Sequence, residues 1–148
     1  MSYAPKVTPV LDTSAYTVGD VMFAPVEIPN VTSRLGGDVT LIGFQVTDES
    51  DQAPAFNIYL MDGNVSLGTI NTPPSISDAL ASGDILGGPF RITTGDYVDL
   101  GGVRTAKVVV DTHIMNCAVD KTSVWIAAVI QSAVTLAVDS IKIRPMFL

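Results

Sequence analysis

The sequence predicts an all-β protein: an antiparallel β-sandwich of jelly-roll type with about eight strands. In residues 56–61, Phe56, Ile58 and Leu60 alternate with the side chains between them, the period of two typical of a strand with one buried face. Turn signals rich in Gly, Asp and Asn recur along the chain. No helical pattern is long enough to cover a parallel sheet. A chain of 148 residues is expected to form one domain, residues 1–148.

The N-terminal third is expected to hold an arm and two strands. Residues 1–12 are polar and carry two prolines, which predicts an extended arm that is either loose or lies on a neighbouring subunit. A strand is predicted over residues 21–28, where Pro25 indicates a sheet edge or a bulge. A second strand is predicted over residues 40–47, with Ile42, Phe44 and Val46 on its core face.

The strand over residues 56–61 is the centre of this interpretation. It ends at Asp62-Gly63-Asn64, three residues that favour a turn, and a Pro- and Ser-rich connection follows until strand pattern resumes near Phe90. A core strand that leads into a long connection is typical of a Greek key. Within the connection, Ser75 or Ser77 is expected to cap a short helical turn over residues 78–81, ended by Gly83.

The remaining strands are predicted from β-branched or alternating stretches: residues 90–93, 97–100, 107–110, 123–131 and 137–144. The chain ends apolar over residues 145–148, so the C-terminus is expected to pack into the core or into a subunit contact.

Composition narrows the possible partners. Apolar residues make up 47% and charged residues 16% of the chain, so part of the apolar excess is expected to be buried between subunits. The net charge is −7 and the eight basic residues are scattered, which argues against nucleic-acid binding. The longest apolar run, residues 124–130, is too short for a membrane span, and no secretory signal is visible. The single cysteine, Cys117, fits a reducing compartment.

Few residues suggest chemistry. Asp111, His113 and Cys117 lie close together in sequence, but their spacing matches no metal or thiol site, and a half-buried His at a strand end is the favoured interpretation. Asp48, Glu49 and Asp51 are taken as hydrated surface acids. Neither this cluster nor the turn at residues 62–64 has the spacing of a calcium loop. Catalytic, cofactor-binding and metal-binding residues are therefore all expected to be absent, and the protein is not expected to be an enzyme.

Four stretches carry a resemblance to a known class of proteins. They are residues 12–23 (DTSAYTVGDVMF), 26–30 (VEIPN), 58–68 (IYLMDGNVSLG) and 95–102 (GDYVDLGG). They resemble the capsid decoration, or cement, proteins of tailed bacteriophages, which have a jelly-roll fold. The resemblance implies a structural virion protein, made in the host cytoplasm, that assembles as a homotrimer, binds the major capsid protein on the outer capsid surface and stabilises the shell.

Two other functional classes remain open at this stage. Jelly rolls also serve as lectin-like domains, so the alternative is a trimeric tail-fibre or baseplate module that binds host surface glycan. For such a module Trp125, Tyr3, Tyr16, Tyr59 and Tyr97 are the aromatic side chains that could stack on sugars, although aromatics at strand positions are more often core. A hydrolase is the third class, and it would need paired carboxylates across a cleft.

Overall fold

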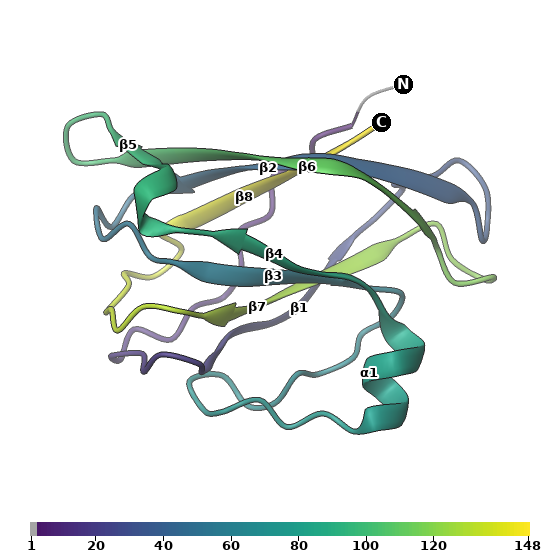
Figure 1. Cartoon of the computed structure of the whole chain (residues 1–148), viewed down its shortest axis with the longest axis horizontal. Coiled ribbons are helices and arrows are strands. Elements are labelled where there is room, and N and C mark those ends of the chain that lie inside the picture. The colour runs from purple at the N-terminus through teal and green to yellow at the C-terminus, as the bar shows by residue number, and fades with distance from the viewer. Residues whose placement is uncertain (1–2) are drawn as a thin grey trace.

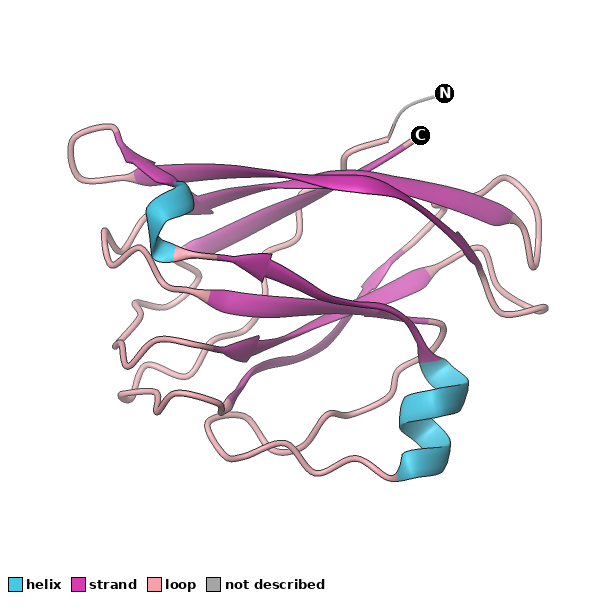
Figure 2. Ribbon diagram, viewed as in Figure 1, coloured by secondary structure: helices cyan, strands magenta, loops and turns pink. Residues whose placement is uncertain are grey.

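A computed structural model of the chain describes residues 3–148, and within them the chain forms eight strands and two short helical elements. The strands are β1 (Val21–Ile28), β2 (Asp38–Asp48), β3 (Phe56–Met61), β4 (Ile85–Ile92), β5 (Tyr97–Asp99), β6 (Arg104–Asn116), β7 (Val124–Ile130) and β8 (Ile141–Phe147). The helix α1 (Asp78–Asp84) precedes β4, and the 3₁₀ turn η1 (Thr94–Asp96) precedes β5 (Figure 2). Two four-stranded antiparallel sheets, ordered β1-β7-β3-β4 and β5-β6-β2-β8, pack face to face (Figure 1). The predicted all-β sandwich of eight strands is confirmed.

The strand pairs are nested in the sequence. β1 pairs with β7, β2 with β6 and β3 with β4, as when one long hairpin is rolled up. This winding is jelly-roll-like. β3 also pairs with β7, which closes the first sheet, while β5 and β8 extend the second sheet at its two edges.

The core lies between the sheets, with β3 at an inner position. Phe56, Ile58 and Leu60 are fully buried, as the alternating pattern predicts. From the opposite sheet Phe44 and Val46 are also fully buried. Each side chain of this size stabilises the fold by about 1.5–3 kcal/mol when it leaves water.

The predicted core face of β2 is correct in its second half and wrong at Ile42. Ile42 is half-buried outside the core, and Leu41 takes the inward position, fully buried. The cause is a bulge: the pairing of β2 with both neighbours shifts between Leu41 and Gly43. One extra residue at a bulge moves the side chains on one side of it to the other face.

Other strand boundaries differ from the predictions where local signals mislead. β1 is an edge strand with a register shift between Phe23 and Val26, so the expectation raised by Pro25 is confirmed. β4 begins at Ile85 rather than near Phe90, because pairing with β3 overrides the weak strand propensity of its glycines. Residues 137–140, predicted as strand, lie outside β8, and Asp139 has a left-handed backbone with φ 52° that interrupts a strand.

The N-terminal arm lies along β8, the strand that ends the chain. The amide of Tyr3 donates to the carbonyl of Phe147 at 2.9 Å, and that of Val7 donates to the carbonyl of Ile143 at 2.8 Å. Val7 and Leu11 are buried. From residue 3 onward the arm therefore runs along the edge of its own sheet; residues 1–2 lie outside the described part. Phe147 is buried, as expected of the C-terminus, and Leu148 is exposed.

The connection between β3 and α1, residues 62–77, folds over the outer face of the first sheet; we call it the covering segment. It forms a second apolar cluster in which its Leu67 is buried against outward-facing side chains of β3 and β7, among them Met61 and Trp125. The amide of Asn71 donates to the carbonyl of Val21, which holds the segment against β1. Ser77 caps α1 by accepting a hydrogen bond from the Leu80 amide at 3.2 Å, one of the two caps predicted.

Candidate functional site

His113 and Cys117 have structural surroundings. His113 is half-buried on β6, where its Nε2 lies 2.9 Å from the carbonyl oxygen of Leu86 and its ring meets the edge of Phe90 at 5.5 Å between centroids. These contacts join β6 to β4. Cys117 is buried, and burial raises the pKa of its thiol, which disfavours the reactive thiolate. The predicted half-burial of His113 is confirmed, but the residue lies within β6, opposite Leu41, rather than at the end of the strand.

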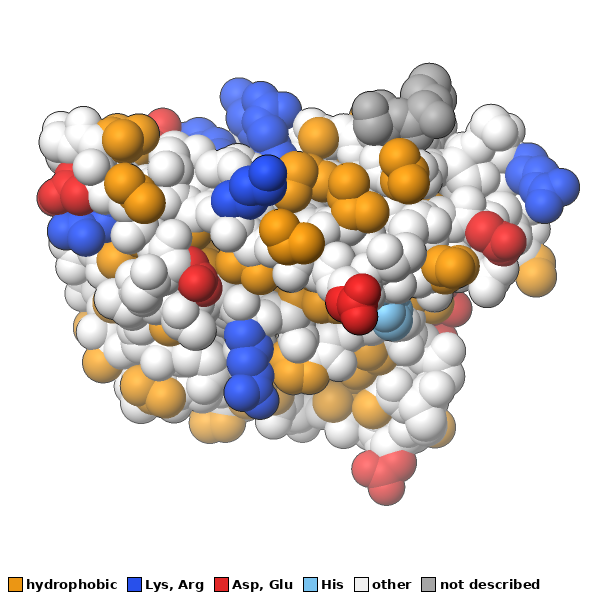
Figure 3. All heavy atoms as spheres, turned by 45° about the horizontal axis from the view of Figure 1, so that its top comes forward, with side chains coloured by type: hydrophobic (Ala, Val, Ile, Leu, Met, Phe, Trp, Pro, Cys, Tyr) orange, Lys and Arg blue, Asp and Glu red, His pale blue; other side chains and the backbone are white. Residues whose placement is uncertain are grey.

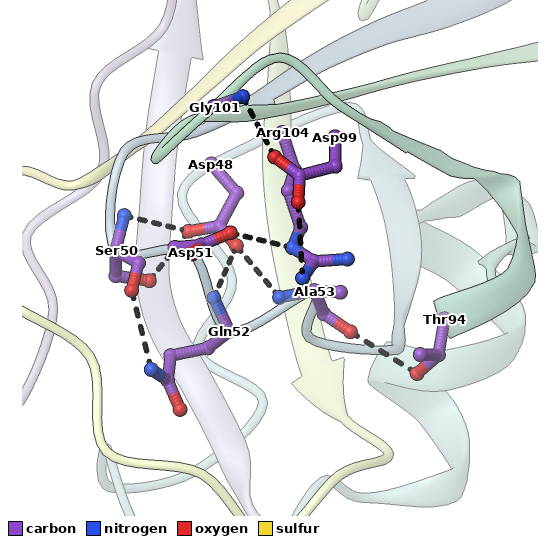
Figure 4. A network of polar contacts seen from close by, with 9 residues as sticks. All are labelled: Asp48, Ser50, Asp51, Gln52, Ala53, Thr94, Asp99, Gly101 and Arg104. Atoms are coloured by element: carbon purple, nitrogen blue, oxygen red, sulfur yellow. Dashed lines mark hydrogen bonds and ion pairs between the residues drawn. The ribbon is translucent and has the colours of Figure 1, made fainter.

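The acidic loop after β2 is held in place by the buried carboxylate of Asp48, so the prediction of a hydrated surface acid is wrong for this residue. Asp48 is fully buried, and its carboxylate accepts hydrogen bonds from the amides of Ser50, Gln52 and Ala53 at 2.7–2.9 Å (Figure 4). The Ser50 hydroxyl donates to the same carboxylate. A carboxylate satisfied in this way orders the loop that carries the chain from one sheet to the other.

The neighbouring acids are held by cations. Arg104 Nε lies 2.6 Å from Asp51 Oδ1, and its Nη2 lies 3.8 Å from Asp99 Oδ2 (Figure 4). Glu49 pairs with Lys142 at 2.7 Å. Among residues 3–148, no group of three or more His, Cys, Asp or Glu side chains is arranged to hold a metal ion.

The aromatic side chains considered for sugar stacking divide into two groups. Tyr16 and Tyr97 are buried, and their hydroxyls donate to the carbonyls of Met22 and Pro54 at 2.7 and 2.8 Å. Burial raises the pKa of both phenols. Trp125 is also buried. The half-buried Tyr3 and Tyr59 keep part of their rings accessible.

The second sheet carries an apolar outer face that nothing in the described chain covers. We call it the β6 face and define it by side chains of β5, β6 and β8 that point away from the core: Val98, Lys107, Val109, Ile114, Arg144 and Met146. Val109 is 74% exposed and Ile114 is 67% exposed, whereas Val108 and Val110 pack against the core. Figure 3 shows hydrophobic side chains gathered over the sheet that forms the top of Figure 1.

Cross-strand register sets charges among these apolar groups. Arg144, Gln45 and Lys107 form one row across β8, β2 and β6, and the next row joins Met146, Gly43 and Val109. Within residues 3–148, neither Lys107 nor Arg144 makes an ion pair. The β6 face is therefore apolar with two cations that make no ion pair within the described residues, in a chain whose net charge is −7. Arg144 donates a hydrogen bond to the carbonyl of Ala4 at 3.1 Å, and the exposed Asp111 lies on β6 between Val109 and Ile114.

Sequence reasoning found the strand but not the face. Val108-Val109-Val110 is a continuous apolar run, and such a run does not by itself indicate which of its side chains point outward. The available signal was Lys107, because a lysine is expected to point outward and Val109, two residues further along the strand, shares its face.

Comparison with known proteins leaves the family open. No protein-family model matches the sequence, and no curated protein is significantly similar to it. In the described residues, no helix is both long and apolar enough to span a membrane.

Proposed function

We propose that this chain is a structural virion protein that binds the outer surface of a tailed-phage capsid as an oligomer and stabilises the shell. The resemblance of residues 12–23, 26–30, 58–68 and 95–102 to capsid decoration proteins supports this function. The structural observation that carries it is the β6 face, an uncovered apolar surface on a sandwich whose other sheet is covered by its own chain.

The charges of the β6 face favour the shell as its occupant over a second copy of the same face. In a two-fold contact, Lys107 and Arg144 of both copies would be brought together in an apolar environment, and like charges there are unfavourable. An acidic and apolar surface complements the face instead. We assign that surface to the major capsid protein.

Stabilisation follows from multivalency. The affinity of a contact through one face of a small sandwich is modest. In a homotrimer, once one subunit is bound, the other two bind at a high effective concentration, so the trimer binds much more tightly than one subunit. Each trimer would then hold neighbouring capsomers together, and the shell would resist internal pressure through many such clamps.

A binding experiment with shells stripped of this protein tests the assignment. Val109→Asp places a carboxylate in the centre of the β6 face and is expected to lower shell affinity at least tenfold, since juxtaposing it with the acidic surface of the shell costs more than about 1.4 kcal/mol. The measurement is occupancy by co-sedimentation, with the wild-type protein as reference.

The matched control is Val138→Asp, because Val138 is 70% exposed in a loop outside the face and Val109 is 74% exposed. Both variants are expected to keep the wild-type melting temperature. Equal occupancy for Val109→Asp and Val138→Asp would remove the β6 face from the contact.

A further inference from the structure

A groove runs along the outer face of the first sheet, on the opposite side of the sandwich from the β6 face. One part has a volume of about 300 Å³ and is lined by Asn57, Arg91, Thr93 and Gln131 among others. The adjoining part, of about 190 Å³, shares Asn57 and Gln131 and has an apolar wall that includes Leu67. We call the whole the Arg91 groove. Its size is at the lower end of the range of about 300–1,000 Å³ typical of small-ligand sites.

Strand register builds the polar part of the groove. Asn57 on β3 lies opposite Arg91 on β4 and opposite Val129 on β7, while the neighbouring Phe56 and Ile92 point into the core. Within residues 3–148, the side chains of Asn57, Arg91 and Gln131 make no hydrogen bond or ion pair with the rest of the chain. Their donors and acceptors are therefore available to a ligand.

The charge of the groove contrasts with that of the chain. Among the described residues that line it, Arg91 alone is charged, although the chain has 15 acidic and 8 basic residues. A guanidinium is a planar fork that binds a carboxylate through two parallel hydrogen bonds. A single cation of this kind matches a ligand group with one negative charge.

The surrounding side chains indicate what the rest of the ligand is. Two amides, Asn57 and Gln131, each offer donors and an acceptor, which suits the paired hydroxyls of a sugar ring. Tyr59, Pro74 and Ile85 form an apolar strip beside them, which suits the C–H face of the same ring. We propose that the Arg91 groove binds a saccharide that carries a carboxylate, with the carboxylate on Arg91 and ring hydroxyls on Asn57 and Gln131.

This binding site goes beyond the proposed function. Only its orientation rests on that function: if the β6 face lies on the shell, the Arg91 groove faces the surrounding medium, because the two lie on opposite sheets. Saccharide binding itself is a property of the isolated chain and is tested without virions.

The test titrates the purified protein with trigalacturonate and with its methyl ester, which keeps the sugar rings and removes the charges. NMR chemical-shift changes and calorimetry measure the affinity. We expect trigalacturonate to bind, the ester to bind at least tenfold more weakly, and Arg91→Gln to lose at least tenfold in affinity for the acid. Arg34→Gln is the matched control, since Arg34 is an exposed arginine outside the groove whose side chain makes no ion pair in the described chain.

Several outcomes would overturn the proposal. They are no binding of trigalacturonate at millimolar concentration, equal binding of acid and ester, and equal losses for Arg91→Gln and Arg34→Gln. Arg91-dependent binding of an acidic peptide without binding of trigalacturonate would also overturn it, since the saccharide would then be the wrong ligand class. None of these results bears on shell binding, which is measured separately.

Discussion

The two outer faces of the sandwich differ in how they are covered. On the first sheet, the covering segment buries Leu67 against β3 and β7, and even the outward residues of β7 are buried. On the second sheet, Val109 and Ile114 of β6 stay exposed. The covering segment lies over the first sheet, whereas nothing in the described chain lies over the β6 face of the second. This difference is the physical basis of the proposed contact with the shell.

The largest expected effect comes from truncating a side chain on each face. Leu67→Ala removes buried contacts on the covered face and is expected to lower the free energy of unfolding by about 2–4 kcal/mol. Ile114→Ala on the β6 face is expected to change it by less than about 0.5 kcal/mol. Urea denaturation of both variants measures the contrast. A large loss for Ile114→Ala would mean that the isolated chain already covers this face, for example by self-association.

A smaller effect concerns the two ends of the connection that covers the first sheet. The amide of Asp62 donates to the carbonyl of Asp84 at 3.0 Å, where the chain leaves β3 and where α1 returns it to the sheet. Burial, and then the nearby charge of Asp84, raise the pKa of Asp62 above its ordinary value of 3.8. Folding therefore favours the protonated side chain of Asp62. The stability that this protonation contributes is fully present below pH 3.8 and is lost as the pH rises through the raised pKa.

Asp62→Asn imitates the protonated side chain. At pH 7 it is expected to raise the free energy of unfolding by a few tenths of a kcal/mol, because Asp62 is only half-buried and solvent screens its charge. The gain is expected to vanish below about pH 3.8. Thermal melts of wild type and variant across this range measure it. Asp78→Asn, on the exposed first turn of α1, is the control and is expected to bring no gain. A gain for Asp62→Asn that persists at low pH would show that charge is not its cause.

The strands could be predicted from the sequence, because a period of two is a local signal. Phe56, Ile58 and Leu60 are buried as their alternation predicts, and Ser77 caps its helix as its chemistry predicts. The bulge that turns Ile42 outward was missed because it arises from pairing with two other strands. The period of two in the side chains gives no information about which strands pair.

The sites were harder to predict, since they depend on contacts between distant segments. The sequence around Asp48 predicts a surface acid in a polar loop, and only the fold of that loop brings three amides to its carboxylate. The extended arm was expected from its prolines, but its place along β8 depends on the bridges that Tyr3 and Val7 make with Phe147 and Ile143. Which sheet the covering segment would cover, and so which face stays bare, had no local signal.

The most direct test of the account is the copy number of the protein in purified virions, measured relative to the major capsid protein by quantitative mass spectrometry. A shell component is expected at a copy number comparable with that of the capsid protein. A copy number that is only a small fraction of that level would contradict the shell function and would favour a recognition module of the tail.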